Sequence, residues 1–296
     1  MRIGRFTISD DEQPWTGVVL PTEGIVVHIA EAGQAAGIPL PPESVSLLKE
    51  WEWKRKTTLS VEHARETGDA IYDRTALEQH APISDPSKII GVGLNYRDHA
   101  EESESTPPEE PVLFAKFSSA LIGPDGPVRW DPALTSEVDS EAELCVVIGT
   151  RARQVNKADA RSYIAGYAPG NDVSARDIQF SDEQWVRGKS LDSFASIGPE
   201  IVTPDEITDP HDLDIWAELN GERLQDSNTR NLIHDIDDLI SFCSRAFTLY
   251  PGDIIYTGTP AGVGIFREPP ALMSDGDTIT VGIEDLGELT NYCKHG

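Results

Sequence analysis

Short apolar runs separated by polar and turn-forming residues recur along most of the chain. Runs of about four to eight residues that are rich in apolar residues predict β-strands. Such runs, bounded by turn residues, lie at 2–7, 16–20, 24–28, 88–92, 111–117, 164–172, 213–219 and 252–256. The pattern therefore predicts a protein in which strands outnumber helices.

Helical periodicity is clearest towards the end of the chain. Within 236–247 the apolar residues recur every three or four positions and form one stripe, which predicts a helix packed on the core: Ile236, Leu239, Ile240, Cys243 and Phe247. Weaker helical spacing predicts further helices at 44–53, 60–66 and 157–163.

The order of these elements predicts two domains. Residues 1–80 contain short strands and two helices and predict a small N-terminal α+β domain. Residues 81–87 contain two prolines and predict a linker at the start of the larger unit, 81–296. Strands in that unit are short and do not alternate regularly with helices, so an α+β, mostly β fold, a mixed β-roll, is favoured over alternating β/α units.

Composition narrows the classes of partner. The chain of 296 residues has 51 acidic and 24 basic residues and a formal net charge of −27. Nucleic acids and anionic membranes require a positive face, so neither is an expected partner. So large an acidic excess resembles the surfaces of proteins that stay soluble in concentrated salt, and it predicts a halophilic source.

The cysteines and the hydropathy pattern bear on the compartment. Cys145, Cys243 and Cys293 are odd in number, widely spaced and mostly set in apolar surroundings, which predicts free thiols in a reducing compartment. No apolar run approaches the roughly 18 residues of a membrane span, and no secretory signal pattern opens the chain. We therefore expect a soluble cytoplasmic protein.

Three carboxylates predict a metal site. Glu141 and Glu143 are two apart in a strand-like segment and should project from one face, and Asp172 ends another strand-like run. Neighbouring carboxylates repel each other unless a positive charge lies between them. Three carboxylate ligands suit Mg²⁺ or Mn²⁺, whereas zinc favours His and Cys. The alternative is an ordinary solvated face of an acidic protein.

His99 and Glu102 are candidates for a general base. At a spacing of three they share a face of one helical turn, and a carboxylate beside an imidazole fixes its tautomer and raises its basicity. The alternative is a solvated turn with accidental spacing. The polar segment 101–110 that follows is typical of a lid that orders over a ligand.

Several further residues carry candidate chemistry. Arg176 and Gln179 follow Asp172 closely, and Lys189 either pairs with the carboxylates, stabilises an anion on a substrate, or is a surface charge. Lys116 either reaches the surface or faces the acidic pocket. A glycine-rich segment at 257–264 follows a strand and brings backbone N–H groups and a threonine hydroxyl towards an anionic ligand, without the ending of a P-loop.

Together these motifs resemble the fumarylacetoacetate hydrolase family. The resemblance covers nearly all of 88–293 and rests on the segments 91–96, 99–102, 111–114, 141–144, 172–177, 188–190 and 257–260 in order. It implies a mixed β-roll, a homodimer, and one Mg²⁺ or Mn²⁺ bound by Glu141, Glu143 and Asp172. It also implies that His99 and Glu102 form a lid dyad that activates water, and that a set of polar residues holds the substrate: Arg176, Gln179, Lys189 and Thr259.

The implied chemistry is metal-assisted and acts on a 2-oxo carboxylate. The first expectation is hydrolysis of a C–C bond in an acylpyruvate or fumarylacetoacetate-type β-diketo acid, with Lys189 and Gln179 placed for the developing negative charge. The same site in the family supports oxaloacetate decarboxylation, hydroxymuconate-type isomerisation and dehydration of 2-keto-3-deoxy sugar acids. A protein that binds a metal and a dicarboxylate without turnover is a third possibility, against which the His99 and Glu102 pair argues.

Overall fold

A computed structural model describes residues 1–8 and 13–296. Within them thirteen strands form one sheet, whose main path runs β4-β3-β2-β1-β15-β12-β11-β18-β6-β7. Its members are β1 (Arg2–Thr7), β2 (Trp15–Leu20), β3 (Ile25–His28), β4 (Ile71–Asp73), β5 (Glu78–His80), β6 (Ile89–Gly93), β7 (Val112–Lys116), β8 (Leu121–Ile122), β11 (Ala142–Ile148), β12 (Ile164–Asp172), β14 (Ala195–Ile197), β15 (Ile201–Val202) and β18 (Ile254–Tyr256).

Two smaller sheets complete the strand structure of the described residues. One has five strands in the order β17-β16-β19-β20-β9, and the other pairs β10 with β13. Their bounds are β9 (Pro127–Trp130), β10 (Val138–Asp139), β13 (Ser174–Ala175), β16 (Asp214–Leu219), β17 (Glu222–Asn228), β19 (Thr278–Ile283) and β20 (Gly287–His295).

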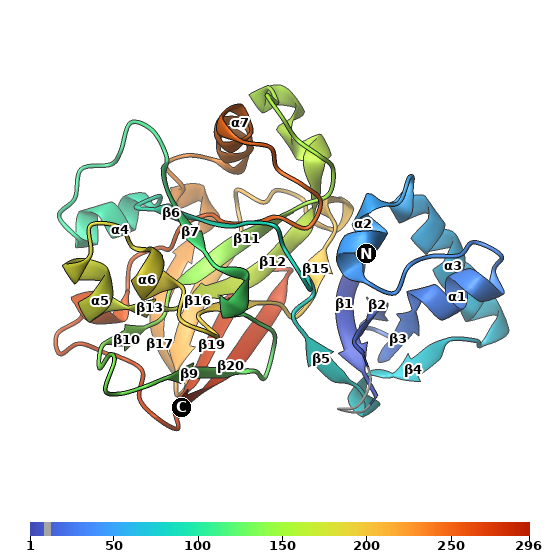
Figure 1. The fold of residues 1–296 in the computed structure, drawn as a ribbon, viewed down its shortest axis with the longest axis horizontal. Helices are drawn as coiled ribbons and strands as arrows, with labels where there is room; N and C mark the ends of the chain where they lie inside the picture. Colours follow the sequence, from blue (N-terminus) through green and yellow to red (C-terminus); the bar gives the residue numbers. More distant parts are fainter. Residues whose placement is uncertain (9–12) are drawn as a thin grey trace.

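The helices are short and lie around these sheets (Figure 1). The α-helices are α1 (Ile29–Ala35), α2 (Ser44–Lys49), α3 (Trp53–Thr67), α4 (Arg97–Glu102), α5 (Arg176–Ser181), α6 (Val186–Lys189) and α7 (Ile236–Ala246). The 3₁₀ turns are η1 (Arg74–Ala76), η2 (Ser118–Ala120), η3 (Lys157–Tyr163), η4 (Pro204–Glu206), η5 (Thr229–Asn231) and η6 (Gly264–Phe266). In the parts described, no helix has the length and apolarity that crossing a membrane requires.

The central strand β11 separates two hydrophobic cores. Leu144 and Val146 pack in a core that includes residues of β16, β19 and α7, whereas Cys145 and Val147 pack in the core shared with the N-terminal strands. All seven residues of β11 are buried, since both faces of the strand are covered. That burial explains why this segment is continuously apolar after Glu143.

The sheet-rich α+β fold and the helix at 236–247 are confirmed. The apolar stripe of α7 lies in the first core, as its spacing predicts. Two local expectations differ from the structure. Residues 157–163 form a 3₁₀ rather than an α-helix, and the helix predicted at 44–53 ends at Lys49, after which a new helix begins at Trp53.

The N-terminal residues join the large sheet directly. β1 pairs with β15, and β15 pairs with β12, so the first strand lies in the same sheet as the strand that ends in Asp172. The predicted linker is also packed, because Ile83 is fully buried in the second core. We retain the domain boundary between residues 80 and 81 as a proposal.

Glu200 lies where the two units meet and is expected to destabilise the fold near neutral pH. Its carboxylate accepts a hydrogen bond from Gln79 Nε2 at 3.2 Å, and burial raises its pKa in spite of that bond and of Arg74 and Arg2. A raised folded-state pKa means that the folded protein binds this proton more tightly than the unfolded chain does. The contribution of Glu200 to the free energy of unfolding therefore falls as the pH rises above the pKa of this carboxyl in the unfolded chain.

Substituting Glu200→Gln is therefore expected to raise the Tm at about pH 7 and to change it little at about pH 4, where the unfolded carboxyl is largely protonated. Thermal unfolding at the two pH values measures this. An equal change in Tm at both would contradict the assignment.

Candidate active site

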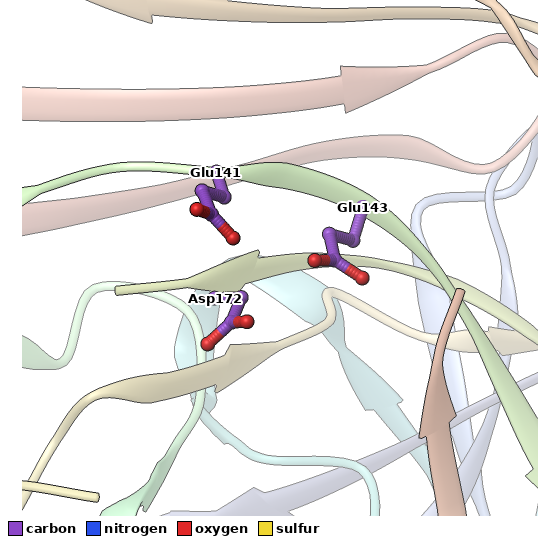
Figure 2. A group of neighbouring side chains, drawn as sticks. All are labelled: Glu141, Glu143 and Asp172. Atoms are coloured by element: carbon purple, nitrogen blue, oxygen red, sulfur yellow. The ribbon is translucent and has the colours of Figure 1, made fainter. Parts of the chain in front are cut away.

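Two adjacent strands bring three carboxylates together. Glu143 lies on β11, Glu141 directly precedes it, and Asp172 is the last residue of β12. Because Ala142 pairs with Asn171, the backbone N–H of Asp172 donates to the carbonyl of Glu141 at 2.9 Å. Carboxylate oxygens of the three residues lie within 4.8 Å of one another, and all three side chains are buried. Figure 2 shows them side by side.

Buried cations balance two of the three carboxylates. Lys189 Nζ donates to Glu141 at 2.7 Å and to Asp172 at 2.9 Å. Lys116 Nζ, from β7, donates to the other oxygen of Asp172 and to the carbonyl of Val173 at 3.2 Å. Of the two placements left open for Lys116 by the sequence, the structure has the one that faces the acidic pocket.

Glu143 is the carboxylate without such compensation. Among the described residues its side chain has no ion pair, and it accepts a hydrogen bond from the backbone N–H of Gly258 at 2.6 Å. Burial raises its pKa well above the ordinary value, and the charges of Asp172 and Glu141 raise it further. For Glu141 the balance is opposite, because Lys189 and Arg176 outweigh burial and lower its pKa.

This arrangement fits a divalent cation with oxygen ligands. Three carboxylate oxygens within 4.8 Å match the hard ligand set of Mg²⁺ or Mn²⁺, and Glu143 supplies a buried negative charge that such an ion would neutralise. Since burial of an unpaired charge is costly, the same residues would also be a poor choice for a purely structural core.

The predicted dyad forms on the short helix α4. His99 Nδ1 lies 3.1 Å from Glu102 Oε2, and the second oxygen of Glu102 accepts the backbone N–H of Gly262 at 2.8 Å. The imidazole also packs against Phe266, with the ring centroids 5.9 Å apart. With Nδ1–H donating to Glu102, Nε2 is left as the basic nitrogen of the ring.

One pocket of about 200 Å³ unites the predicted residues. Seven of them line it: His99, Glu141, Glu143, Arg176, Gln179, Lys189 and Thr259. Glu102 and Asp172 lie behind this lining. Glu102 contacts His99, and Asp172 accepts a hydrogen bond from Lys189. The Arg176 guanidinium donates to Gln179 Oε1 at 2.8 Å and lies 2.7 Å from Glu141, so the polar residues of the pocket and the carboxylate cluster form one network.

Sequence reasoning missed the aromatic wall of the pocket. Phe114 and Trp185 pack edge to face with centroids 5.6 Å apart, and Lys189 Nζ lies 5.1 Å from the Phe114 ring centroid. A Cβ on Gly91 would lie 2.1 Å from the Phe114 ring, and one on Gly93 would lie 2.4 Å from the Trp185 ring. Glycines inside a strand indicate such close approaches, and Gly91 and Gly93 were the signal available in the sequence.

Comparison with known proteins gives these observations a context. The family model for the fumarylacetoacetate hydrolase C-terminal domain matches residues 88–293. The chain is 40% identical over 293 residues to the rat protein "Oxaloacetate tautomerase Fahd2a, mitochondrial", covering 98% of this chain and 91% of that protein. It is similar in structure to 5-carboxymethyl-2-hydroxymuconate delta-isomerase from Mycobacterium smegmatis, at 34% identity and a TM-score of 0.77, covering 100% of this chain and 99% of the other.

A third relative was solved with a metal. The structure of maleylpyruvate hydrolase from Sphingobium sp. SYK-6 in complex with manganese(II) and pyruvate matches at 30% identity and a TM-score of 0.79, with both chains fully covered. A metal ion in a structural relative agrees with the ligand set that the three carboxylates offer here.

The predicted cytoplasmic location is wrong by this comparison. Curated relatives from frog, rat and human, 38–40% identical over at least 98% of this chain, are named as mitochondrial proteins. The prediction rested on free thiols and on the lack of a membrane span, and neither feature distinguishes the cytoplasm from another reducing compartment.

Sequence, fold and site thus agree with one another: the chain belongs to the fumarylacetoacetate hydrolase family.

Proposed function

We propose that this protein is a Mg²⁺- or Mn²⁺-dependent enzyme that moves a proton at the carbon beside the keto group of a small 2-oxo carboxylate, with oxaloacetate keto–enol tautomerisation as its reaction. The observation that carries the proposal is that the His99 imidazole lines the same pocket as Glu141 and Glu143 of the carboxylate cluster. The 40% identity to an oxaloacetate tautomerase over nearly the whole chain supports this choice of reaction.

Glu141, Glu143 and Asp172 would hold the cation. When bound, it would supply Lewis acidity, withdrawing electron density from the keto and carboxylate oxygens of the substrate and so making the neighbouring C–H bond more acidic. In this proposal Arg176 and Gln179, which line the pocket, bind the substrate carboxylate. Thr259 lines the same pocket, and its hydroxyl accepts a hydrogen bond from Gln225 at 2.8 Å.

His99 performs the proton transfer in this proposal. Its Nε2 accepts the proton from the carbon, the electron pair of the broken C–H bond forms the C=C bond, and the π electron pair of the C=O bond moves onto the oxygen. Nε2 then returns the proton to that oxygen, which becomes the enol hydroxyl. Burial lowers the pKa of Lys189, but Asp172 and Glu141 outweigh it and raise the pKa overall, so the side chain stays an ammonium. That ammonium stabilises the oxygen as negative charge develops on it.

Pocket size favours a short substrate. Small-molecule sites commonly span about 300–1,000 Å³, and this pocket of about 200 Å³ suits an acid of few carbons. The sequence-based expectation of C–C bond hydrolysis is retained as the second candidate, because the same dyad can activate water and a maleylpyruvate hydrolase is similar over the whole chain.

A substrate panel tests the proposal. Oxaloacetate enol-to-keto conversion, oxaloacetate decarboxylation, and turnover of acetylpyruvate, fumarylpyruvate and a 2-keto-3-deoxypentonate would be measured with Mg²⁺, Mn²⁺ or EDTA. We expect tautomerisation to have the largest kcat/KM and to be abolished by EDTA. Dominant cleavage of an acylpyruvate would replace the tautomerase proposal by the hydrolase, and full activity in EDTA would refute the metal site.

The same preparations test two further proposals. Activity and stability that require molar KCl would support the halophilic origin proposed from the net charge of −27, and full stability in dilute buffer would count against it. Light scattering that gives twice the chain mass of 32.4 kDa would support the homodimer, and the chain mass itself would refute it.

A further inference from the structure

Asp139 is a buried carboxylate to which neither the proposed mechanism nor the metal cluster assigns a role. It lies on the two-residue strand β10, opposite Ser174 of β13, and is 1% exposed. Within the described part of the chain it accepts hydrogen bonds from four donors. These are the backbone N–H groups of Ser140 at 2.9 Å, Gly264 at 3.1 Å and Ile265 at 3.1 Å, and Arg176 Nε at 2.9 Å.

On one side Asp139 sets the position of a substrate-facing group. With Nε held by Asp139, the Arg176 guanidinium directs Nη1 towards Glu141 and Gln179. Its Nη2 is buried and has no hydrogen-bond partner among the described groups. A planar guanidinium bound along one edge is oriented as a whole, so Asp139 determines where the remaining donors point.

On the other side Asp139 holds the loop on which α4 rests. The N–H groups of Gly264 and Ile265 open the 3₁₀ turn η6, and the end of that turn, Phe266, packs on the imidazole of His99. Two residues before the turn, the N–H of Gly262 donates to Glu102. The segment 262–266 therefore contacts both members of the dyad, and Asp139 is its anchor in the core.

The geometry points to Asp139 as a positioning residue that couples the Arg176 guanidinium to the seating of α4 over the pocket. Ligand binding at Arg176 would in this way be transmitted through Asp139 to the loop that holds His99 and Glu102. This coupling rests on the proposed function, in which Arg176 binds the substrate and His99 is the base. Asp139 supports the positions of both residues.

A carboxylate is the side chain that this junction requires. Both of its oxygens are used twice, and an asparagine would offer one acceptor oxygen and place an NH₂ group against N–H donors. The approach is close, because a Cβ on Gly264 would lie 2.5 Å from Asp139 Oδ1. A longer side chain in place of Asp139 would disturb the same contact.

Asp139→Asn is the direct test of this coupling. Its main measurement is amide hydrogen exchange, which needs no turnover, and kcat is a second measurement. The probe is oxalate with Mn²⁺, since two adjacent carboxylates present the same pair of oxygens as a 2-oxo acid. In the wild type, oxalate is expected to increase amide protection both at 97–102 and at 262–266. In Asp139→Asn we expect retained Mn²⁺ binding, loss of the protection at 97–102, and a fall in kcat of roughly 100-fold with a smaller change in KM.

Asp177→Asn is the matched control. Asp177 follows Arg176 directly, and its carboxylate accepts hydrogen bonds from the Thr135 hydroxyl at 2.6 Å and from the Ile178 N–H at 2.8 Å. In the part of the chain that is described, no hydrogen bond or ion pair joins it to residues 262–266. This variant is expected to lose stability yet keep the oxalate-induced protection of α4.

Arg176→Lys provides a second route if Asp139→Asn does not fold. A lysine keeps the charge but lacks Nε, so the protection at 97–102 should again be lost, although no hydrogen bond or ion pair among the described residues joins Arg176 to that helix. Wild-type protection in either variant, or its equal loss in Asp177→Asn, would overturn the coupling. Hydrogen exchange is measured without turnover, so it tests the coupling even if the protein does not catalyse oxaloacetate tautomerisation.

Discussion

Glu143→Gln is expected to weaken metal binding and turnover strongly while making the metal-free protein more stable. The substitution keeps the shape of the side chain and its hydrogen bond from Gly258, but it removes a buried negative charge that has no ion pair among the described residues. Loss of a direct ligand should weaken Mn²⁺ binding by at least about 100-fold. The kcat/KM should fall by a similar factor or more.

The expected gain in stability of Glu143→Gln over the wild type depends on pH. The pKa of Glu143 is raised from its ordinary 4.5 by burial and by Asp172 and Glu141, so the folded state binds this proton more tightly than the unfolded state. The wild type therefore loses stability relative to Glu143→Gln as the pH rises above about 4.5. Below that pH both side chains are neutral and the difference should vanish.

Calorimetric Mn²⁺ titration and denaturant unfolding in EDTA, at about pH 4 and pH 7, measure both effects. Glu288→Gln, at an exposed position of β20, is the matched control and should change neither. Tight Mn²⁺ binding by Glu143→Gln would show that Glu143 is not a metal ligand. A less stable metal-free variant at neutral pH would show that the buried charge of Glu143 does not destabilise the fold.

His99→Ala is expected to lower kcat by roughly 100-fold or more without loss of metal affinity. The imidazole is the basic group that lines the pocket beside the carboxylates, and Glu102 holds its Nδ1 at 3.1 Å, so its removal leaves no base positioned for the substrate proton. The carboxylates and their cations are untouched by the change, and Mn²⁺ should bind as in the wild type.

Glu102→Gln separates the two functions of the dyad. Glutamine can still accept the Gly262 N–H, so α4 should keep its position, but the negative charge beside His99 Nδ1 is lost and kcat should fall by a smaller factor. His63→Ala, on α3 in the N-terminal unit, is the control for loss of a histidine. Wild-type kcat in His99→Ala would remove the dyad from the mechanism.

The fold class, the carboxylate pair and the dyad followed from short-range patterns, whereas the family followed from the resemblance of motifs along 88–293. Glu141 and Glu143 are two apart and their carboxylates lie together, His99 and Glu102 are three apart and share a helical turn, and α7 has its apolar stripe in the first core. Such spacings depend on neighbours in the chain, and the geometry of one strand or one turn translates them into positions in space.

Other features of the site have no short-range signal. Lys116 reaches Asp172 across 56 residues, and Asp139 reaches Gly264 across 125, so each contact depends on which strands pair and in which register. The sequence left Lys116 between the surface and the acidic pocket, and it gave no reason to separate Asp139 from the other acidic residues. The burial of Ile83 in the predicted linker also has no short-range signal, because it depends on a core formed by strands that are distant in the sequence.

Local residue order was thus sufficient to predict strands, helices, the carboxylate pair and the dyad, since each is defined within a few residues. The charge balance of the cluster, the aromatic wall over Gly91 and Gly93, and the link from Arg176 through Asp139 to α4 emerged with the packed fold. They arise from contacts between segments far apart in the chain, and the energy of burying charge and apolar surface selects those contacts only when all the segments are in place.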